Sequence, residues 1–266
     1  MVWGSLATQF CLELAFGVLL GLCLIPRAPL GVFFHRMMGT TALVPLLIAG
    51  LVPPLYAGVP WTSPIVLGSL AACAIFPFFS GPLPSRKRVG ATYLALVCCG
   101  VALVASVVAS VEAAAESGVG TGTLVLGSLS AMSTGVVAGG VGLAMVVGHW
   151  YLTVPQLPIS LLVRLNRLTA WAMGASVVLL VATILLHKDV LQAAETPILS
   201  DFGLFYLGAR VAVGLALPLL FAWMTSSSLK YENTRSATGI LYASTVLVLI
   251  GAAAALSLQD SYGVPL

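Results

Sequence analysis

Two formal charges, Glu13 and Arg210, lie deep inside long apolar stretches of this chain. A lone charge at the centre of a membrane helix costs roughly 2.5 to 3.5 kcal/mol, which favours pairing or a hydrated cavity over contact with lipid. Gln9 precedes Glu13 by one helical turn, and Tyr206 precedes Arg210 by one turn. Residues four apart share a helix face, so we expect these four side chains to form one polar cluster.

The composition shows what solvent surrounds these charges. Of the 266 residues, 60% are hydrophobic and 7% are charged, and the mean hydropathy is +1.10. Ordinary soluble domains contain about 25% charged residues, so a soluble globular domain is excluded. The net charge of +3 comes from bases spread along the chain and forms no patch that could bind nucleic acid. The expected partner of most of the surface is therefore the lipid bilayer.

Eight apolar stretches are long enough to cross the hydrocarbon core, which takes about 20 helical residues. They cover residues 6–26, 41–59, 64–79, 91–111, 123–151, 168–187, 203–224 and 236–256. The sequence predicts an all-α, polytopic membrane protein with eight transmembrane helices. Its longest polar connection covers residues 188–202.

The basic residues orient this bundle, because Lys and Arg stay on the cytoplasmic side during insertion. Connections on one face contain Arg27, Arg36, Arg86, Lys87, Arg88, Arg164, Arg167, Lys230 and Arg235, and the other face has only Lys188. We expect an inner-membrane protein with both termini outside the cytoplasm. In this topology Glu13 and Arg210 lie about 10 Å below the same outer boundary, at 1.5 Å per residue. Opposite charges at one depth predict a pair.

Short similarities between the two parts of the chain predict an internal repeat. Pro26 and Pro29 after the first helix correspond to Pro155 and Pro158 after the fifth, and Gly68 corresponds to Gly208. The halves, residues 1–116 and 117–266, are expected to be parallel four-helix units related by an axis along the membrane normal. Neither buried charge recurs in the other half. The fifth helix is rich in small residues, which favours close helix packing; they include Gly135, Gly139, Gly140, Gly142 and Gly148.

Other chemistry receives little support from the residue types. The five cysteines lie in apolar runs without a spacing typical of metal sites, so we interpret them as small buried hydrophobes and predict no metal centre. Haem b is disfavoured, because only His35 and His149 share a membrane boundary and His35 is expected in a loop. Every Asp is expected in a loop, and no nucleophile lies beside a base within the spans, so a hydrolase is disfavoured.

Eight helices in two halves, external termini and almost no soluble mass resemble the membrane subunits of the polysulfide-reductase (NrfD-like) and DMSO-reductase-anchor type. The resemblance covers the whole chain but consists of architecture alone, and no site residue is carried over from it. It implies a quinone bound between helices and a partner subunit that contains iron–sulfur centres.

Three functions follow as hypotheses. The first is a quinone-interacting or anchoring membrane subunit of a respiratory complex, with partners that carry the redox centres. In that hypothesis Glu13 and Arg210 are the candidate catalytic residues: Glu13 exchanges protons with the quinone headgroup, and Arg210 keeps the carboxylate ionised or binds a quinone carbonyl. Gln9 and Tyr206 are the candidate cofactor-binding residues. The second is a small-solute transporter, which the scarcity of polar residues within the spans disfavours. The third is a structural subunit, in which the two charges only fix helix packing.

Overall fold

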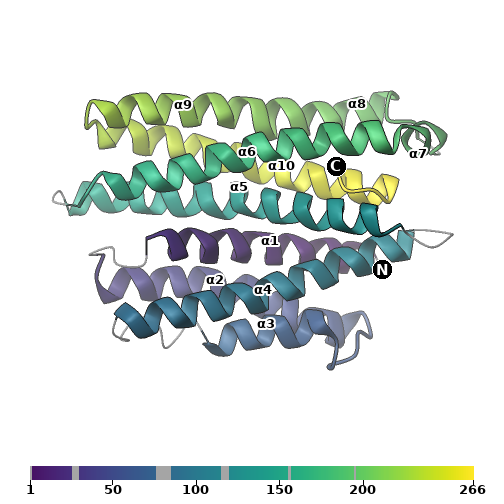
Figure 1. Cartoon of the computed structure of the whole chain (residues 1–266), viewed down its shortest axis with the longest axis horizontal. Coiled ribbons are helices and arrows are strands. Elements are labelled where there is room, and N and C mark those ends of the chain that lie inside the picture. Colours follow the sequence, from purple (N-terminus) through teal and green to yellow (C-terminus); the bar gives the residue numbers. More distant parts are fainter. Residues whose placement is uncertain (1, 26–29, 76–84, 115–119, 155–156, 195) are drawn as a thin grey trace.

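The computed structural model describes residues 2–25, 30–75, 85–114, 120–154, 157–194 and 196–266, and this part of the chain is helical without a strand. The long helices lie side by side along one axis (Figure 1). In chain order they are α1 (Val2–Leu24), α2 (Gly31–Tyr56), α3 (Pro64–Ile75), α4 (Ser85–Ala114), α5 (Thr121–Thr153), α6 (Ser160–Leu186), α7 (Lys188–Ala193), α8 (Asp201–Gly208), the π-helical segment η1 (Ala209–Ala216), α9 (Leu217–Lys230) and α10 (Thr234–Tyr262).

Seven helices in the described part of the chain are long and apolar enough to cross a membrane, with α8, η1 and α9 forming one of them. The third predicted span is shorter, because α3 ends at Ile75 and residues 76–84 lie outside the described residues. The last turns of α2 and α4 line the same cavity at one end of the bundle. Ile65, near the start of α3, lines this cavity too, so α3 runs back from the end of the bundle at which α2 finishes.

Several helices extend further than the hydropathy pattern predicts. α2 begins at Gly31, ten residues earlier than expected, so His35 and Arg36 belong to its first turns rather than to a loop. α6 begins at Ser160 and includes Arg164 and Arg167. An apolar stretch ends at its first charged residue, but the helix can continue beyond it. Long basic side chains reach the membrane interface while the backbone stays helical.

The predicted polar connection 188–202 also contains helical structure. Residues Lys188–Ala193 form α7, and α8 starts at Asp201, where the Ser200 hydroxyl accepts a hydrogen bond from the Gly203 amide. Asp201 stands in the first turn of α8, where a carboxylate interacts favourably with the helix dipole. The connection is therefore largely folded against the end of the bundle.

The two halves meet along α1 and α5, the central pair of Figure 1. A Cβ atom added to Gly135 would come within 2.5 Å of the Glu13 carbonyl oxygen, and a Cβ on Gly139 would overlap the backbone of α1. Gly17 of α1 packs on the Gly135 backbone in the same way. The predicted role of glycine in close packing is thus confirmed at this crossing, because any side chain would force the helices apart.

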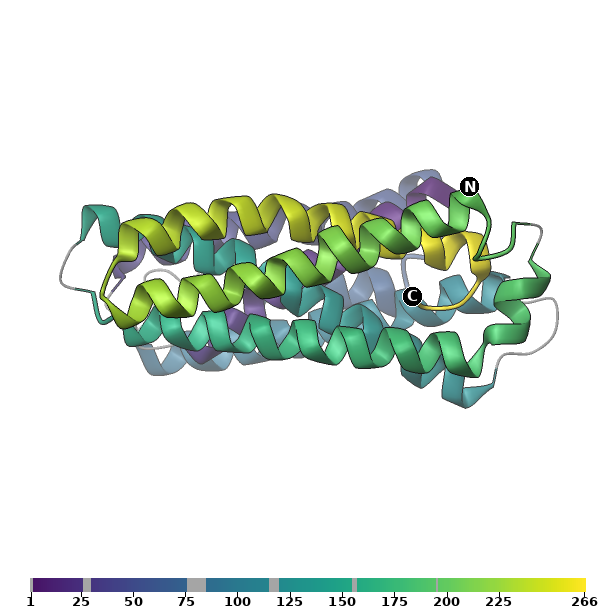
Figure 2. The ribbon, with the colours of Figure 1, turned by 90° about the horizontal axis from the view of Figure 1, so that it is seen from above.

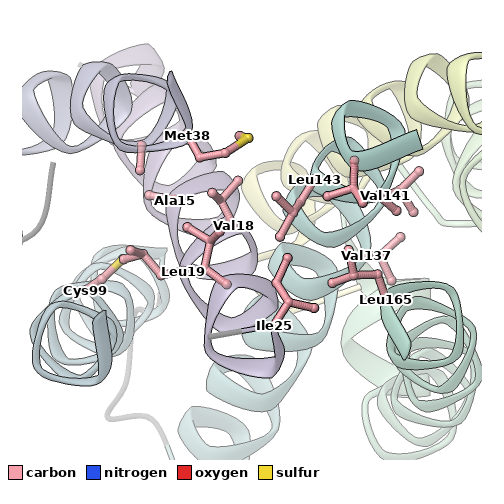
Figure 3. Close-up of a cluster of buried hydrophobic side chains, with 14 of the residues drawn as sticks. Ala15, Val18, Leu19, Ile25, Met38, Cys99, Val137, Val141, Leu143 and Leu165 are labelled. Carbon is pink, nitrogen blue, oxygen red and sulfur yellow. The ribbon is translucent and has the colours of Figure 1, made fainter. Parts of the chain in front are cut away.

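The hydrophobic core surrounds this crossing. Figure 3 shows side chains from α1, α2, α4, α5 and α6 that meet around Leu19 and Leu143. A second, smaller cluster joins α6, η1 and the end of α10, with Leu215, Leu258 and Tyr262 among its members. Both chain ends lie at the same end of the bundle in Figures 1 and 2, which we call the terminal end.

The predicted repeat is described only in part. Pro26, Pro29 and Pro155 lie outside the described residues. Gly68 packs against the α4 backbone near Cys98, whereas a Cβ on Gly208 would meet no described atom within 4 Å. These two equivalent glycines therefore have different surroundings, and the superposition of residues 1–116 on 117–266 stays a prediction.

Candidate functional site

Glu13 and Arg210 are both buried in the middle of the bundle. Glu13 is the twelfth of the 23 residues of α1 and is 3% exposed, while Arg210, in η1, is 1% exposed. At 1.5 Å per residue, Glu13 lies about 16 Å from the start of α1, deeper than the sequence predicted, because α1 begins four residues earlier than expected. Arg210 bonds to Thr134, whose neighbour Gly135 packs against the Glu13 backbone, so both charges lie at the α1–α5 crossing.

A chain of side-chain hydrogen bonds leads from Glu13 towards the terminal end. Gln9 donates from Nε2 to Glu13 Oε1 (3.0 Å) and to Gln259 Oε1 (3.1 Å). Gln259 of α10 donates in return from Nε2 to Gln9 Oε1 (2.9 Å) and to Ser110 Oγ (2.9 Å) on α4. Three helices that are far apart in sequence are thus joined by one network, which we call the amide chain: Ser110, Gln259, Gln9 and Glu13.

Arg210 lies on the other side of α5 and has a different partner. Its Nη2 donates to Thr134 Oγ1 (2.8 Å), and Thr134 is 3% exposed. In the described part of the chain no ion pair joins Arg210 to Glu13, and Glu13 Oε2 and Arg210 Nε have no hydrogen-bond partner. Glu13 and Arg210 are therefore neighbours at the α1–α5 crossing, but they do not form a direct salt bridge.

The segment that contains Arg210 is π-helical for eight residues, Ala209–Ala216. It ends next to Pro218, which lacks the N–H of a regular helical turn. The Leu217 amide bonds to the Ala212 carbonyl, five residues back, so the wider turn bridges the position where proline interrupts the α-helical pattern. π-helical turns occur frequently at functional sites, and this one contains the buried Arg210.

A cavity of about 460 Å³ lies at the terminal end, between α1, α2, α3, α4 and α10. Most of its wall is apolar, with Leu6, Pro53 and Ile65 among the lining residues. Ser106, Ser110 and Gln259 contribute polar groups, so the amide chain begins in the wall of this cavity. Asp260 lines the exposed rim. Ligand sites typically occupy 300–1,000 Å³ and combine apolar walls with a few polar groups, as this cavity does.

The structure brings Gln9 and Glu13 together but leaves Tyr206 apart. The Tyr206 ring packs against Phe202 (4.6 Å between centroids) and Phe205, and among the described residues no hydrogen bond joins it to Glu13. Its role as a cofactor-binding residue stays a prediction.

Sequence reasoning missed Gln259, Ser110 and Thr134. Gln259 lies three residues beyond the end of the last predicted span, 236–256. A longer predicted helix would have included it as a polar residue worth considering. Ser110 and Thr134 are small hydroxyl residues of a kind common in apolar helices, and nothing in the sequence marks them.

The three histidines occupy separate places. His35 is buried in α2 beside Phe34, His149 lies near Tyr242 on the flank of α10, and His187 contacts Thr123. The described residues contain no group of three His, Cys, Asp or Glu side chains that could hold a metal ion. The five cysteines are unpaired and lie in helices; Cys23 and Cys99 are buried, as the sequence predicts, whereas Cys11, Cys73 and Cys98 are only partly buried.

No protein-family model, no curated protein and no solved structure matches this chain. The amide chain and its cavity must therefore be interpreted from their own geometry.

Proposed function

We propose that this chain is a quinone-interacting membrane subunit of a redox complex, that it spans the inner membrane eight times with both termini outside, and that it binds the quinone headgroup in the terminal-end cavity. One observation carries the proposal: Ser110 and Gln259 in the cavity wall connect through Gln9 to the buried Glu13 carboxylate. A ligand in the cavity is thereby coupled, through a continuous run of polarised hydrogen bonds, to a buried carboxyl group.

The chemistry of a quinone fits this arrangement. Reduction of a quinone to a quinol takes up two electrons and two protons, and oxidation of the quinol releases them. The carbonyl and hydroxyl oxygens of the ring match the hydroxyl and amide groups of Ser106, Ser110 and Gln259, while the apolar wall suits the ring and its isoprenoid tail. Glu13 serves as the group that takes up or releases a proton, and Arg210 stabilises its ionised form. The electrons pass to or from a partner subunit that carries the redox centres.

Quinone binding tests the site directly. The purified chain in phosphatidylcholine nanodiscs is titrated with a short-chain benzoquinone and a short-chain naphthoquinone, and we expect saturable binding of one of them at one site. Ala109→Leu places bulk in the cavity and should weaken binding tenfold or more, whereas Ala105→Leu, one turn earlier on α4 in a separate apolar groove, should leave it unchanged. Absence of saturable binding, or equal binding by both variants, contradicts the proposal.

Turnover tests the role of Glu13. In the complex isolated with its partner subunits, Glu13→Gln should leave assembly and quinone binding intact and abolish quinone-linked turnover, because the amide still accepts from Gln9 but exchanges no proton. Normal turnover in an assembled Glu13→Gln complex shows that the residue is a scaffold. Solute flux without quinone binding would instead favour the transporter hypothesis.

The orientation has its own test. Cysteines introduced one at a time at Ser85 and Gln192 are probed on intact cells with an impermeant thiol reagent. Gln192 is exposed in α7, at the end where α6 finishes, and we expect only the cysteine at this position to be labelled. Labelling of Ser85→Cys on intact cells would reverse the topology.

A further inference from the structure

The amide chain has a fixed direction, which follows from counting its donors. A side-chain amide has two N–H groups and one carbonyl oxygen. Both N–H groups of Gln9 are used, on Glu13 and Gln259, and both N–H groups of Gln259 are used, on Gln9 and Ser110. The two glutamines thus exchange a reciprocal pair of hydrogen bonds, each presenting N–H to the other's oxygen.

The direction originates in a backbone group on α4. The Ser110 hydroxyl donates to the Val107 carbonyl (2.9 Å), so the oxygen lone pairs of Ser110 are left to face Gln259. Only the NH₂ side of the Gln259 amide can satisfy them. With Gln259 held in this way, Gln9 must turn its own oxygen towards Gln259 Nε2 and its own N–H groups towards Glu13 and Gln259 Oε1.

The opposite orientation of Gln9 is unfavourable. If its amide were reversed, the Gln9 oxygen would face two acceptors, Glu13 Oε1 and Gln259 Oε1, in a buried setting where unsatisfied polar groups cost the most. Glu13 Oε1 is therefore always an acceptor. Oε2 has no hydrogen-bond partner among the described residues, so it is the oxygen that carries the proton when the carboxyl group is protonated.

We propose that Gln259 and Ser110 are positioning residues for Glu13: acting through Gln9, they hold an N–H group against Oε1 and reserve Oε2 for the exchanged proton. This inference adds Gln259 and Ser110 to the residues that act on Glu13. It rests on the proposed function only for the identity of the group that exchanges the proton. It predicts that substitutions of Gln259 on α10 or Ser110 on α4 change the hydrogen bonding of the Glu13 carboxyl group on α1.

Infrared spectroscopy of the full chain in nanodiscs reports on that carboxyl group without any quinone. The carbonyl stretch of protonated Glu13 is identified at low pH as the band that Glu13→Gln removes. In the native chain we expect one band at the reduced wavenumber of a hydrogen-bonded carbonyl. Gln259→Leu should move it to higher wavenumber, and Ser110→Ala should split it into two bands, because the Gln259 amide can then adopt both orientations.

One further variant separates positioning from general structural damage. Ser257→Ala, at a half-buried position of α10 where the hydroxyl bonds to the Ala253 carbonyl of its own helix, should retain the native band.

Three results would overturn the proposal: an unshifted band in Gln259→Leu, a single unshifted band in Ser110→Ala, or no Glu13 band at any pH. Because no quinone is present, the proposed function can fail in the binding and turnover tests while the positioning role stands, and the reverse is equally observable.

Discussion

Glu13 and Arg210 are buried to almost the same extent, yet the protein surrounds them differently. Glu13 is connected through three hydrogen-bonded side chains to a cavity at the terminal end, whereas Arg210 bonds, among the described residues, to a single hydroxyl, that of Thr134. The acidic group therefore communicates with a space where a ligand can bind, and the basic group is enclosed by packed helices. This difference supports the proposed roles, proton exchange for Glu13 and charge compensation for Arg210.

We expect the largest effect on stability from a substitution at the α1–α5 crossing, where both charges lie. Gly135→Leu introduces a side chain where a Cβ alone would come within 2.5 Å of the Glu13 carbonyl oxygen. The backbone cannot move aside as a flexible side chain could, so we expect a loss of about 3 kcal/mol or more in the free energy of unfolding, at the upper end for overpacking. Unfolding by detergent titration measures it.

Gly142→Leu is the matched control, because a Cβ at Gly142 of the same helix would meet no described atom within 4 Å. Comparable destabilisation by both variants would show that the crossing is not specially tight.

The next largest effect concerns the two charges as a unit. Arg210→Met removes a buried positive charge together with its hydrogen bond to Thr134, and we expect a loss of about 3 kcal/mol in the free energy of unfolding, the upper end for hydrogen bonds to charged groups. Glu13→Gln should cost less, because its oxygen still accepts from Gln9. In the double variant we expect part of the loss to be recovered, with a coupling of about 1 kcal/mol or more. Strictly additive unfolding free energies would show that the charges are independent.

The third effect isolates the partner of Arg210. Thr134→Val removes the oxygen that accepts from the guanidinium and should lower the free energy of unfolding by about 2 kcal/mol, as for hydrogen bonds to charged groups. Thr134→Ser keeps the hydroxyl and should stay close to the native value. If the two variants unfold alike, the hydroxyl contributes nothing to the burial of Arg210.

A neutral contact on the same helix provides the smallest effect and a baseline. Ser133 of α5 bonds to Ser176 (2.8 Å) and to the Ala172 carbonyl (2.9 Å) of α6. Ser133→Ala should cost about 1 kcal/mol, because no charge is involved. Ser128→Ala, whose hydroxyl bonds to its own helix, should cost less. A Ser133 effect as large as that of Thr134→Val would remove the distinction between charged and neutral sites.

Much of the helical architecture followed from the sequence. Long apolar stretches predict membrane helices whatever surrounds them, because a backbone without water must satisfy its hydrogen bonds internally. The ends of the helices were less predictable, as His35 and the early start of α2 show. The apolar stretch predicts the part of a helix that lies in lipid. It does not predict where the helix ends, because helical hydrogen bonding continues beyond the lipid.

The candidate site also contains some residues that the sequence predicted and others that it did not. Glu13, Gln9 and Arg210 stood out from the sequence because charged and amide side chains are costly in an apolar stretch, and local spacing alone placed Gln9 beside Glu13. The sequence could not reveal that Gln259, 250 residues away, completes an amide pair with Gln9, or that Thr134 receives the guanidinium. Such contacts depend on which helices are neighbours and on their rotation about their own axes. Both are decided by close packing at positions such as Gly135, and therefore by the tertiary structure alone.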